Sequence, residues 1–469
     1  MLEKLVCGAA AVLAIGAGPA YANDLSRFYE LAQSHDAALQ AAQAQREASV
    51  EARPQALAAL LPQVQGVASA SRERIGLAVA SPQSDVSPQS GTASRLGAPE
   101  DCNLSADGQI ERCTGDTHGY GLSVSQILWS FAGFSKLREA NAEVASADAA
   151  LQAAREDLIL RVAAGYFAIL SARDQLSLSR AERDAFGRLL NQARNREKTG
   201  VGPHSDVALD QSYFDDTAQG VIDARNALDD AQLAMTEITG ADARDVEPLR
   251  ENIPMEPPQP ASADAWVAAA LAGNPQLHAA DLAAVAADRD IAAQRGHALP
   301  TITLNAATTR GYQELALGGS SSNDQIGVSI VWPLFQGGAV ASAVRQSRAL
   351  YHQAEAQLAT TQRDIERQTR TAYRDVVSGI ERIAVARHAV QSNRNAVEAS
   401  RHDVEFGTGG EFQLLSAQVS YFAAQRAYSQ TRYDYLTALL SLKEQAGQLT
   451  ARDLAELDAL LVPRAHEAP

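Results

Sequence analysis

The feature that most constrains this chain is that it repeats itself. The segment 34–65 resembles the segment 272–303 at an offset of 238 residues, and the offset is 206 and then 207 further along the chain. The aligned pairs are Pro62 with Pro300, Leu137 with Val344, Tyr166 with Tyr373, Gly200 with Gly407, and Gly240 with Gly447. Similarity over so long a period predicts two copies of one structural unit.

The change of offset marks an insertion of 32 residues in the first repeat, since 238 minus 206 is 32. The inserted part holds a stretch rich in Ser, Pro and Gly (81–100) together with Cys102 and Cys113, and insertions belong in exposed loops. A cysteine pair in an exported protein favours a disulfide, although two free thiols remain an alternative.

The first 22 residues have the pattern of a signal peptide. A short polar start is followed by an apolar core at 5–18, which is too short to span a membrane, and by the small-x-small motif Ala20-Tyr21-Ala22. The mature chain is therefore expected to begin near Asn23. Cys7 lies inside the apolar core and would leave with the signal.

Each repeat contains two runs in which apolar and polar residues alternate, as in a β-strand. The expected strands are about 62–71, 118–129, 300–310 and 325–333. Each has roughly the length that crosses an outer membrane at a tilt, and the polar positions carry Gly, Ser, Thr and Asn. Half-buried hairpins of a soluble protein are the alternative.

Four strands are too few to close a membrane barrel, because small single-chain barrels begin at about eight strands. An open sheet edge in lipid would leave backbone groups without hydrogen bonds. If these strands lie in a membrane, several chains must contribute strands to one barrel. The pattern therefore indicates an oligomer.

Long helices follow the strands. Leu137, Val144, Leu151 and Leu158 recur every seven residues, with small residues three positions further on, and the second repeat does the same from Val344 to Ile365. This heptad pattern predicts helices that pack closely. As a single helix, residues 133–199 would be about 100 Å long, which is longer than a compact domain needs.

The pattern divides the chain into five parts, each with its own expected content. They are the signal peptide (1–22), repeat 1 (23–240, with helices about 132–199 and 205–239), a proline-rich linker (241–262), repeat 2 (263–447, with helices about 338–405 and 411–446), and a C-terminal tail (448–469).

These motifs together resemble the TolC-type outer-membrane efflux and secretion proteins. The resemblance rests on the duplicated LLPQV and ALPTI strand starts, VWPLFQGGAV, AAGYFAIL, the Gly-rich tips, and the EITG and EQAG helix ends, over about residues 24–460. It implies an α+β membrane protein with two internal repeats. In a homotrimer, four strands per chain would form a 12-stranded β-barrel, continued by a long α-helical barrel.

The resemblance also implies a function and a location. The protein would be a passive exit duct in the outer membrane of a Gram-negative bacterium, reaching into the periplasm, for type I protein secretion or drug efflux. Its partners would be outer-membrane lipid, a periplasmic adaptor (membrane fusion protein) and an inner-membrane pump, either ABC-type or proton-driven. No cofactor, metal or nucleic acid is implied.

The family closes its periplasmic end with a ring of helix tips, and the resemblance carries over there only in part. Ser205 and Asp206 stand where the family has a Thr-Asp pair, whereas Gln413 and Ser416 replace two aspartates of the second repeat. Gly409 replaces an arginine that braces the closed tip. We expect Asp206 and Glu411 to supply the acidic ring, and a helix-capping role for Asp206 remains open.

Two further groups of residues are singled out by position. Gly200, Gly202, Gly407 and Gly409 form the tip turns at which an adaptor would dock. Trp129, Trp332, Pro333, Gly337 and Gly338 mark the joint between strand and helix. The tryptophans fit a membrane boundary, although a role in a protein core is the alternative.

Composition and motifs exclude other functions. The formal net charge of −16 disfavours a nucleic-acid partner, and it fits either plain solubility or an acidic lumen or docking face. No H-E-x-x-H motif, phosphate-binding glycine loop or nucleophile elbow is present, so the chain is not expected to be an enzyme. A secreted coiled-coil or adhesin-like trimer is the alternative function, but it leaves the paired strands unexplained.

Overall fold

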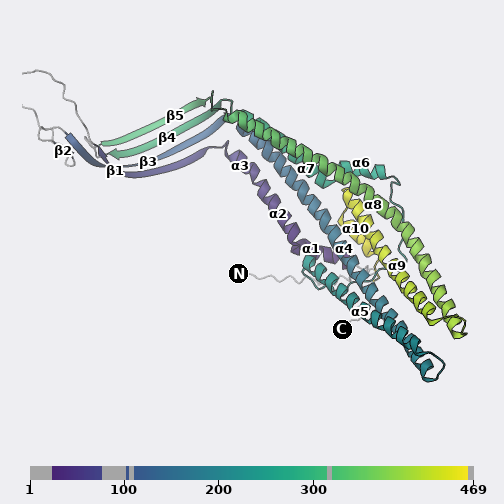
Figure 1. Ribbon diagram of the computed structural model, residues 1–469. Coiled ribbons are helices and arrows are strands. Elements are labelled where there is room, and N and C mark those ends of the chain that lie inside the picture. The colour runs from purple at the N-terminus through teal and green to yellow at the C-terminus, as the bar shows by residue number, and fades with distance from the viewer. Residues whose placement is uncertain (1–23, 76–101, 105–109, 314–318, 463–469) are drawn as a thin grey trace, which may run out of the picture. The chain divides into compact units, whose positions relative to one another are not determined.

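The computed structural model describes residues 24–75, 102–104, 110–313 and 319–462 (Figure 1). The expected signal peptide lies outside these residues. The first half of the chain contains α1 (Asp24–His35), α2 (Ala37–Val50), α3 (Ala52–Ala58), β1 (Gln63–Ile75), β2 (Cys102–Leu104), β3 (Ile110–Ser130), α4 (Phe131–Lys198) and α5 (His204–Thr239). The second half contains α6 (Ala263–Gly273), α7 (Pro275–Gly296), β4 (Thr301–Gln313), β5 (Gly319–Val331), α8 (Ala339–Glu405), α9 (Glu411–Gln445) and α10 (Ala451–Asp458).

The chain divides into two compact units. Unit 1, the helical unit, comprises the described residues up to 46, then 147–280 and those from 357 onward. Unit 2 comprises residues 47–146 and 281–356 and contains the strands. The long helices α4 and α8, of 68 and 67 residues, each contribute to both units. Among the described residues, no helix is both long and apolar enough to cross a membrane.

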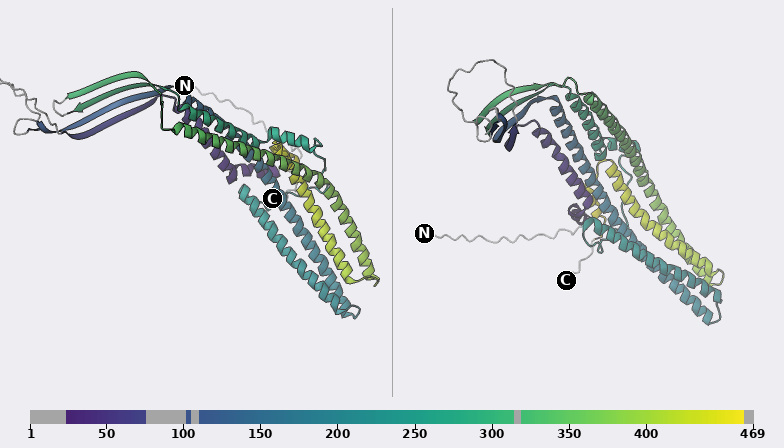
Figure 2. Two further views of the ribbon diagram at one scale, coloured as in Figure 1. Left: turned by 45° about the horizontal axis from the view of Figure 1, so that its top comes forward. Right: turned by 60° about the vertical axis from the view of Figure 1, so that its left-hand side comes forward.

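The sheet of unit 2 is antiparallel, with the strand order β1–β3–β4–β5, and β2 pairs with the outer part of β3 (Figure 2). The strands of the two expected repeats meet where β3 pairs with β4. Two neighbouring rows of cross-strand partners show the character of the two faces. One row is Val64, Val124, Ala306 and Ile326, and the next is Gln63, Ser125, Asn305 and Gly327.

Because side chains alternate across a strand, these rows lie on opposite faces, one apolar and one polar. The apolar face is not covered within the chain: Ile326 is 78% exposed and Ile330 is 67% exposed. The outer strands β1 and β5 are the two edges of this sheet. Unit 2 therefore presents a single-layer sheet with an apolar face and two open edges.

All four long strands run further at one end than the sequence pattern indicated, and β5 also ends at Val331, before the expected 333. The outer ends of β4 and β5 are residues 313 and 319, against the expected 310 and 325. β1 continues to Ile75 and β3 begins at Ile110, beyond the expected bounds of 71 and 118. The additional residues of β1 include Arg72, Glu73 and Arg74, whose charges interrupt the alternation of apolar and polar residues. Backbone pairing continues through them regardless, because the ladder of hydrogen bonds does not depend on side-chain polarity.

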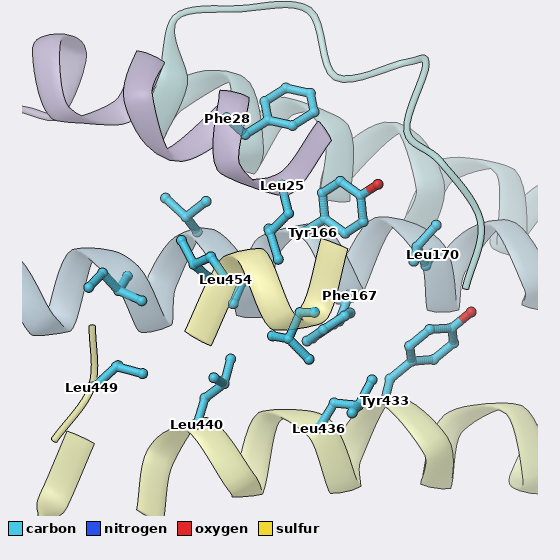
Figure 3. Close-up of a cluster of buried hydrophobic side chains, with 14 of the residues drawn as sticks. Leu25, Phe28, Tyr166, Phe167, Leu170, Tyr433, Leu436, Leu440, Leu449 and Leu454 are labelled. Atoms are coloured by element: carbon cyan, nitrogen blue, oxygen red, sulfur yellow. The ribbon is translucent and has the colours of Figure 1, made fainter. Parts of the chain in front are cut away.

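The core of unit 1 lies where α1, α4, α9 and α10 meet (Figure 3). Large apolar side chains from all four helices fill it, including Leu25, Phe28, Tyr166, Phe167, Leu436, Leu440 and Leu454. The Tyr166 hydroxyl is buried among them and is 3.0 Å both from the Asp24 carboxylate and from the Glu247 carbonyl. The Tyr166 hydroxyl therefore has polar partners inside this core.

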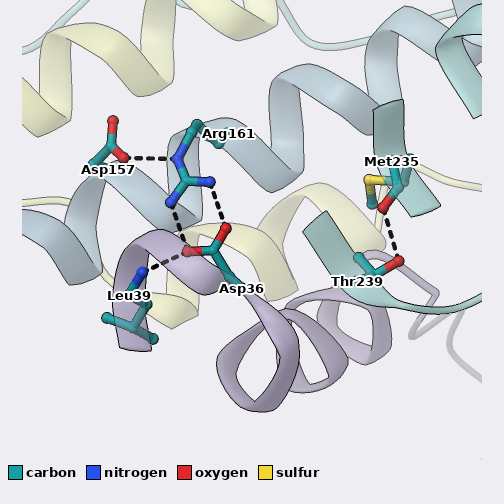
Figure 4. Close-up of polar contacts among 6 residues, drawn as sticks. All are labelled: Asp36, Leu39, Asp157, Arg161, Met235 and Thr239. Atoms are coloured by element: carbon teal, nitrogen blue, oxygen red, sulfur yellow. Dashed lines mark hydrogen bonds and ion pairs between the residues drawn. The ribbon is translucent and has the colours of Figure 1, made fainter. Parts of the chain in front are cut away.

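A second set of polar contacts fixes α2 against α4 (Figure 4). The Asp36 carboxylate accepts bonds from both Arg161 terminal nitrogens, at 2.7 and 3.0 Å, and from the Leu39 backbone N–H at 2.6 Å. Asp36 thus caps α2 and binds Arg161 at once. The hydrogen bond to Arg161 is the main cause that lowers the pKa of Asp36.

Corresponding heptad positions are buried in both long helices, at Leu158 of α4 and Ile365 of α8. Burial at these positions follows from the apolar spacing of the sequence. The pairing of these helices as a coiled coil stays a prediction, as do the bounds of the two repeats.

Candidate functional site

The candidate site is the end of unit 1 at which two helix hairpins turn, namely residues 196–211 and 403–418. The two turns have the same hydrogen bonds. The N–H groups of Val201 and Gly202 donate to the Arg196 carbonyl at 2.9 and 3.1 Å. At the second turn, the N–H groups of Thr408 and Gly409 donate to the Asp403 carbonyl at 2.8 and 3.0 Å. Both helices therefore end in the same type of C-cap.

The four tip glycines are required for two different reasons. Gly200 and Gly407 have φ values of 72° and 69°, a backbone conformation that other residues rarely adopt. A Cβ at Gly202 would lie 2.9 Å from the Arg196 Cβ, and one at Gly409 would lie 2.7 Å from the Asp403 Cβ. In each turn, the first glycine is therefore required by its backbone conformation, and the second by the close approach of a neighbouring side chain.

An ion pair joins the two hairpins at their tips. The Arg196 guanidinium, from the last turn of α4, binds the Glu411 carboxylate, which stands in the first turn of α9. The Glu411 side chain is only 5% exposed. Glu411 is therefore held against α4 by a charged hydrogen bond.

Asp210 lies one helical turn after Asp206 on α5 and is completely buried. Neither of its carboxylate oxygens has a hydrogen-bond partner. Burial raises the pKa of Asp210 to about 7, and the negative charges of Glu411 and Asp206 act in the same direction while Arg196 opposes them. The site therefore combines one paired carboxylate with one that is desolvated and unpaired.

The other expected gate residues are near the tips but outside the ion pair. Asp206 is half-buried in the first turn of α5, where the helix dipole favours a negative charge, and no side chain caps the end of that helix. Ser205, Gln413 and Ser416 are exposed. Asp206 and Glu411 are near enough to Asp210 for their negative charges to raise its pKa. The three neutral residues are at the surface.

Sequence reasoning did not single out Arg196 or Asp210. A signal for Asp210 was present, because Asp206-Val-Ala-Leu-Asp210 places two aspartates four residues apart on one helix face. No comparable signal pointed to Arg196, which is one of several basic residues near the end of α4. Among the described residues, no three side chains of the His, Cys, Asp and Glu types are arranged to hold a metal ion.

The two joints between strand and helix differ. β3 ends at Ser130 and α4 begins at Phe131, with a bulge between Ile127 and Trp129. In the second joint, β5 ends at Val331, and α8 begins only at Ala339. Gly337 and Gly338 in this loop have φ values of 62° and 83°, which requires glycine.

The tryptophans of the joints are partly exposed, and the Trp332 ring nitrogen donates to the Ala298 carbonyl at 3.2 Å. Pro333 is the second residue after β5, where a missing N–H costs no ladder bond. The two cysteines are backbone partners in the pairing of β2 with β3. Their side chains lie outside the described part of the structure, so the disulfide stays a prediction.

The chain is similar in sequence to known outer-membrane proteins. A family model described as outer membrane efflux protein matches residues 28–241 and 266–448. The chain is 29% identical over 445 residues to the outer membrane protein TolC of Vibrio cholerae, covering 94% of each. It is also 29% identical over 439 residues to the alkaline protease secretion protein AprF of Pseudomonas aeruginosa, covering 93% of this chain and 86% of that protein.

Solved structures show the same fold. The outer membrane protein VceC of Vibrio cholerae superposes with a TM-score of 0.73 at 19% identity, covering 90% of this chain and 96% of that one. The Campylobacter jejuni CmeC outer membrane channel superposes with a TM-score of 0.73 at 17% identity, covering 93% and 90%. Because the sequence identities to these two structures are only 19% and 17%, the similarity shows a shared fold and nothing further.

Proposed function

Because this chain belongs to the outer membrane efflux protein family, we propose that it forms the outer-membrane duct of a tripartite export system. The protein lies in the outer membrane of a Gram-negative bacterium and extends into the periplasm. It is a channel protein and not an enzyme. The proposed duct is passive, and transport is driven by an inner-membrane pump linked to it through a periplasmic adaptor.

The observation that carries this proposal is the sheet of unit 2. Its apolar face suits contact with lipid and its polar face suits a wetted lumen. The open edges at β1 and β5 need partners, because unpaired backbone groups are costly in lipid. A homotrimer supplies them: three copies of β1–β3–β4–β5 make a 12-stranded barrel, which the helices continue as an α-helical barrel.

In this proposal the helix tips form the periplasmic entrance. The Arg196–Glu411 ion pair holds the two hairpins of one chain together in the closed state, and Asp206 contributes a negative charge to the mouth. Val201, Phe406 and Phe412 are exposed at the tips. Exposed apolar side chains at one end of a molecule are typical of an interaction site, and they support docking of the adaptor there.

The cargo is proposed to be protein, small molecules, or both. AprF and the Dickeya chrysanthemi relative PrtF are named for protease secretion, whereas the Brucella suis relative BepC is named for efflux. Deletion of the gene, followed by assays of drug sensitivity and of the secreted proteome, separates these cargoes. Loss of one or more secreted proteins with unchanged drug sensitivity would assign the duct to secretion, and the converse would assign it to efflux.

A direct test of the duct uses the purified protein. We expect it to fractionate with the outer membrane, to have the native mass of a trimer in detergent, and to conduct ions in planar bilayers. A soluble rod that does not conduct would instead support the coiled-coil or adhesin-like alternative.

A further inference from the structure

A cavity of about 410 Å³ lies beside α4, where the end of α9 meets the start of α7. Asn274 joins these two helix ends. Its side-chain nitrogen donates to the Gln445 carbonyl at 3.0 Å, and its side-chain oxygen accepts from the Leu277 N–H at 3.1 Å. All the residues that line this junction cavity belong to unit 1. Its volume is in the range of pockets that hold small molecules.

Part of the wall of the junction cavity is apolar and made of small residues. Ala150, Ala153 and Ala154 share one face of α4, because residues three and four apart are neighbours on a helix. Pro275 and Ala279 of α7 also line the cavity. Among the described residues that line it, none is a lysine, an arginine or an aromatic residue. The cavity therefore suits an aliphatic group and offers no positive charge to an anion.

Three carboxyl groups line the same cavity, namely those of Glu156 and Asp157 on α4 and Glu444 on α9. Asp157 already has a charged partner, because its carboxylate pairs with the Arg161 guanidinium at 2.7 Å. Within the described part of the chain, these three groups are not arranged to hold one metal ion. The cavity is also much larger than an ion, so its carboxyl groups suit a larger cation.

Glu156 has an unfilled hydrogen-bonding position at this cavity. The residue is only 4% exposed. Its Oε1 accepts a hydrogen bond from the Gln152 side chain at 3.1 Å, whereas its Oε2 is buried and has no partner in the described part of the structure. A buried carboxylate oxygen without a partner destabilises the folded state. A hydrogen-bond donor bound in the cavity would remove this cost.

Glu156 and Glu444 also lack a compensating positive charge. Burial is the main cause that raises the pKa of Glu156, and it raises the pKa of Glu444 to about 7. The negative charges of Asp157 and Glu156 act on Glu444 in the same direction. At each carboxyl group the opposing influence is a hydrogen bond from a neutral amide, that of Gln152 or Gln445. A bound cation would stabilise both ionised groups.

The acidic pair is not a feature that the two repeats share. At the offset of 207 residues, Glu444 corresponds to Glu237 of α5, but Glu156 corresponds to Arg363 of α8. Glu237 is exposed. It is therefore a matched control for Glu444, since it has the same side chain at the same place in the other repeat.

We propose that the junction cavity binds a small aliphatic amine in its protonated form. The ammonium group donates hydrogen bonds to the Glu156 and Glu444 carboxylates, and the carbon chain lies against Pro275 and the alanines of α4. This inference goes beyond the proposed duct, because it assigns a ligand site that is complete within one chain.

The test is titration calorimetry with the purified full chain in a non-ionic detergent at pH 8. A salt concentration of about 0.15 M KCl screens weak attraction to surface charges. The probe is 1,4-diaminobutane, and 1,4-butanediol is the neutral compound of the same length. We expect the diamine to bind saturably with a Kd of about 1 mM or below, and the diol to bind at least about tenfold more weakly.

Substitutions assign the binding to this cavity. Glu156→Gln and Glu444→Gln should each weaken binding of the diamine by about tenfold or more, whereas Glu237→Gln should bind as wild type does. Ala153→Leu fills the cavity and keeps both carboxylates, and it should abolish binding. Circular dichroism and the native mass in detergent show whether each variant is folded.

The possible outcomes separate this inference from the proposed function. The site would be overturned by equal affinity for the diamine in wild type, Glu156→Gln and Ala153→Leu. Absence of saturable binding to wild type, or binding of the diol as tight as that of the diamine, would overturn it as well. A trimer that conducts but does not bind the diamine would leave the duct intact, and a monomer that binds the diamine but does not conduct would overturn the duct alone.

Discussion

The Arg196 guanidinium of α4 binds the Glu411 carboxylate of α9 and so joins two hairpin tips that are 215 residues apart in the chain. The family resemblance places a bracing arginine at the position of Gly409, where a Cβ would lie only 2.7 Å from the Asp403 Cβ. In this chain the cation at the tip comes instead from the first hairpin and the carboxylate from the second.

Removing the cation of this pair should loosen the tips. Arg196→Ala leaves the buried Glu411 carboxylate without its partner, which should cost about 2–4 kcal/mol of local stability. We expect faster hydrogen–deuterium exchange in residues 196–210 and 405–413, and a higher conductance in planar bilayers.

The exchanged pair Arg196→Glu with Glu411→Arg is the control for this prediction. It keeps an ion pair at the same place and should recover most of the wild-type exchange rate. Equal protection of the tips in wild type and Arg196→Ala would show that the pair does not hold the hairpins together.

The tips should become less stable as the pH rises toward neutrality. The pKa of Asp210 is raised to about 7 in the folded protein from its usual value of 3.8, so between these values the folded state holds a proton that the unfolded state has lost. Stability therefore falls as pH rises through this window, by at most about 4 kcal/mol.

Asp210→Asn removes the ionisable group and should abolish this dependence. The measurement is hydrogen–deuterium exchange of residues 205–215 at pH 5.5 and pH 8, corrected for the intrinsic exchange rate. Asp215→Asn, an exposed neighbour on the same helix, is the control. An Asp210→Asn variant with the same pH dependence as wild type would assign the effect to another group.

The acidic residues at the mouth should favour cations. Three copies of Asp206 around one entrance would lower the energy of a cation there, so Asp206→Asn should reduce the potassium-to-chloride permeability ratio by about twofold or more. Glu411→Gln should act mainly through Arg196, which it leaves unpaired. Reversal potentials in planar bilayers measure both effects, with Ser205→Ala as control.

An unchanged permeability ratio in the Asp206→Asn, Glu411→Gln double variant would remove the basis for an acidic ring. In that case, the remaining role of Asp206 is its favourable interaction with the dipole of α5.

The contact of Asp36 with Arg161 should stabilise unit 1. Asp36→Ala removes two charged hydrogen bonds and the cap of α2, and we expect a loss of about 2–3 kcal/mol. Because the pKa of Asp36 is lowered, this stabilisation is present above pH 3.8 and is lost as the pH falls through the folded pKa.

Denaturant unfolding followed by circular dichroism measures this loss. The matched control is Asp157→Ala, which removes a single bond to Arg161 from a carboxylate that is mostly exposed. Exposed ion pairs contribute about 0–1 kcal/mol, so the control should unfold close to wild type. An equal loss of unfolding free energy in Asp36→Ala and Asp157→Ala would show that the buried position of Asp36 does not make its ion pair with Arg161 stronger.

Much of the local structure could be predicted from the sequence by itself. The positions of Gly200 and Gly407 indicated turns because a positive φ is a property of the residue and its immediate neighbours. The alternation of apolar and polar residues indicated the strands for the same reason, since side chains alternate whatever the strand pairs with. It also indicated which residues share the face of Ile326 and Ile330.

Only the tertiary structure decided which charged groups meet. The spacing of Asp206 and Asp210 indicates that they share a helix face, but it does not indicate that Asp210 is buried while Asp215 is exposed, because burial depends on whether another helix covers that face. Arg196 and Glu411 come together because the lengths and phases of four helices bring two turns to the same end. Propensity and periodicity act over a few residues, whereas desolvation and ion pairing depend on chain segments that are distant in sequence.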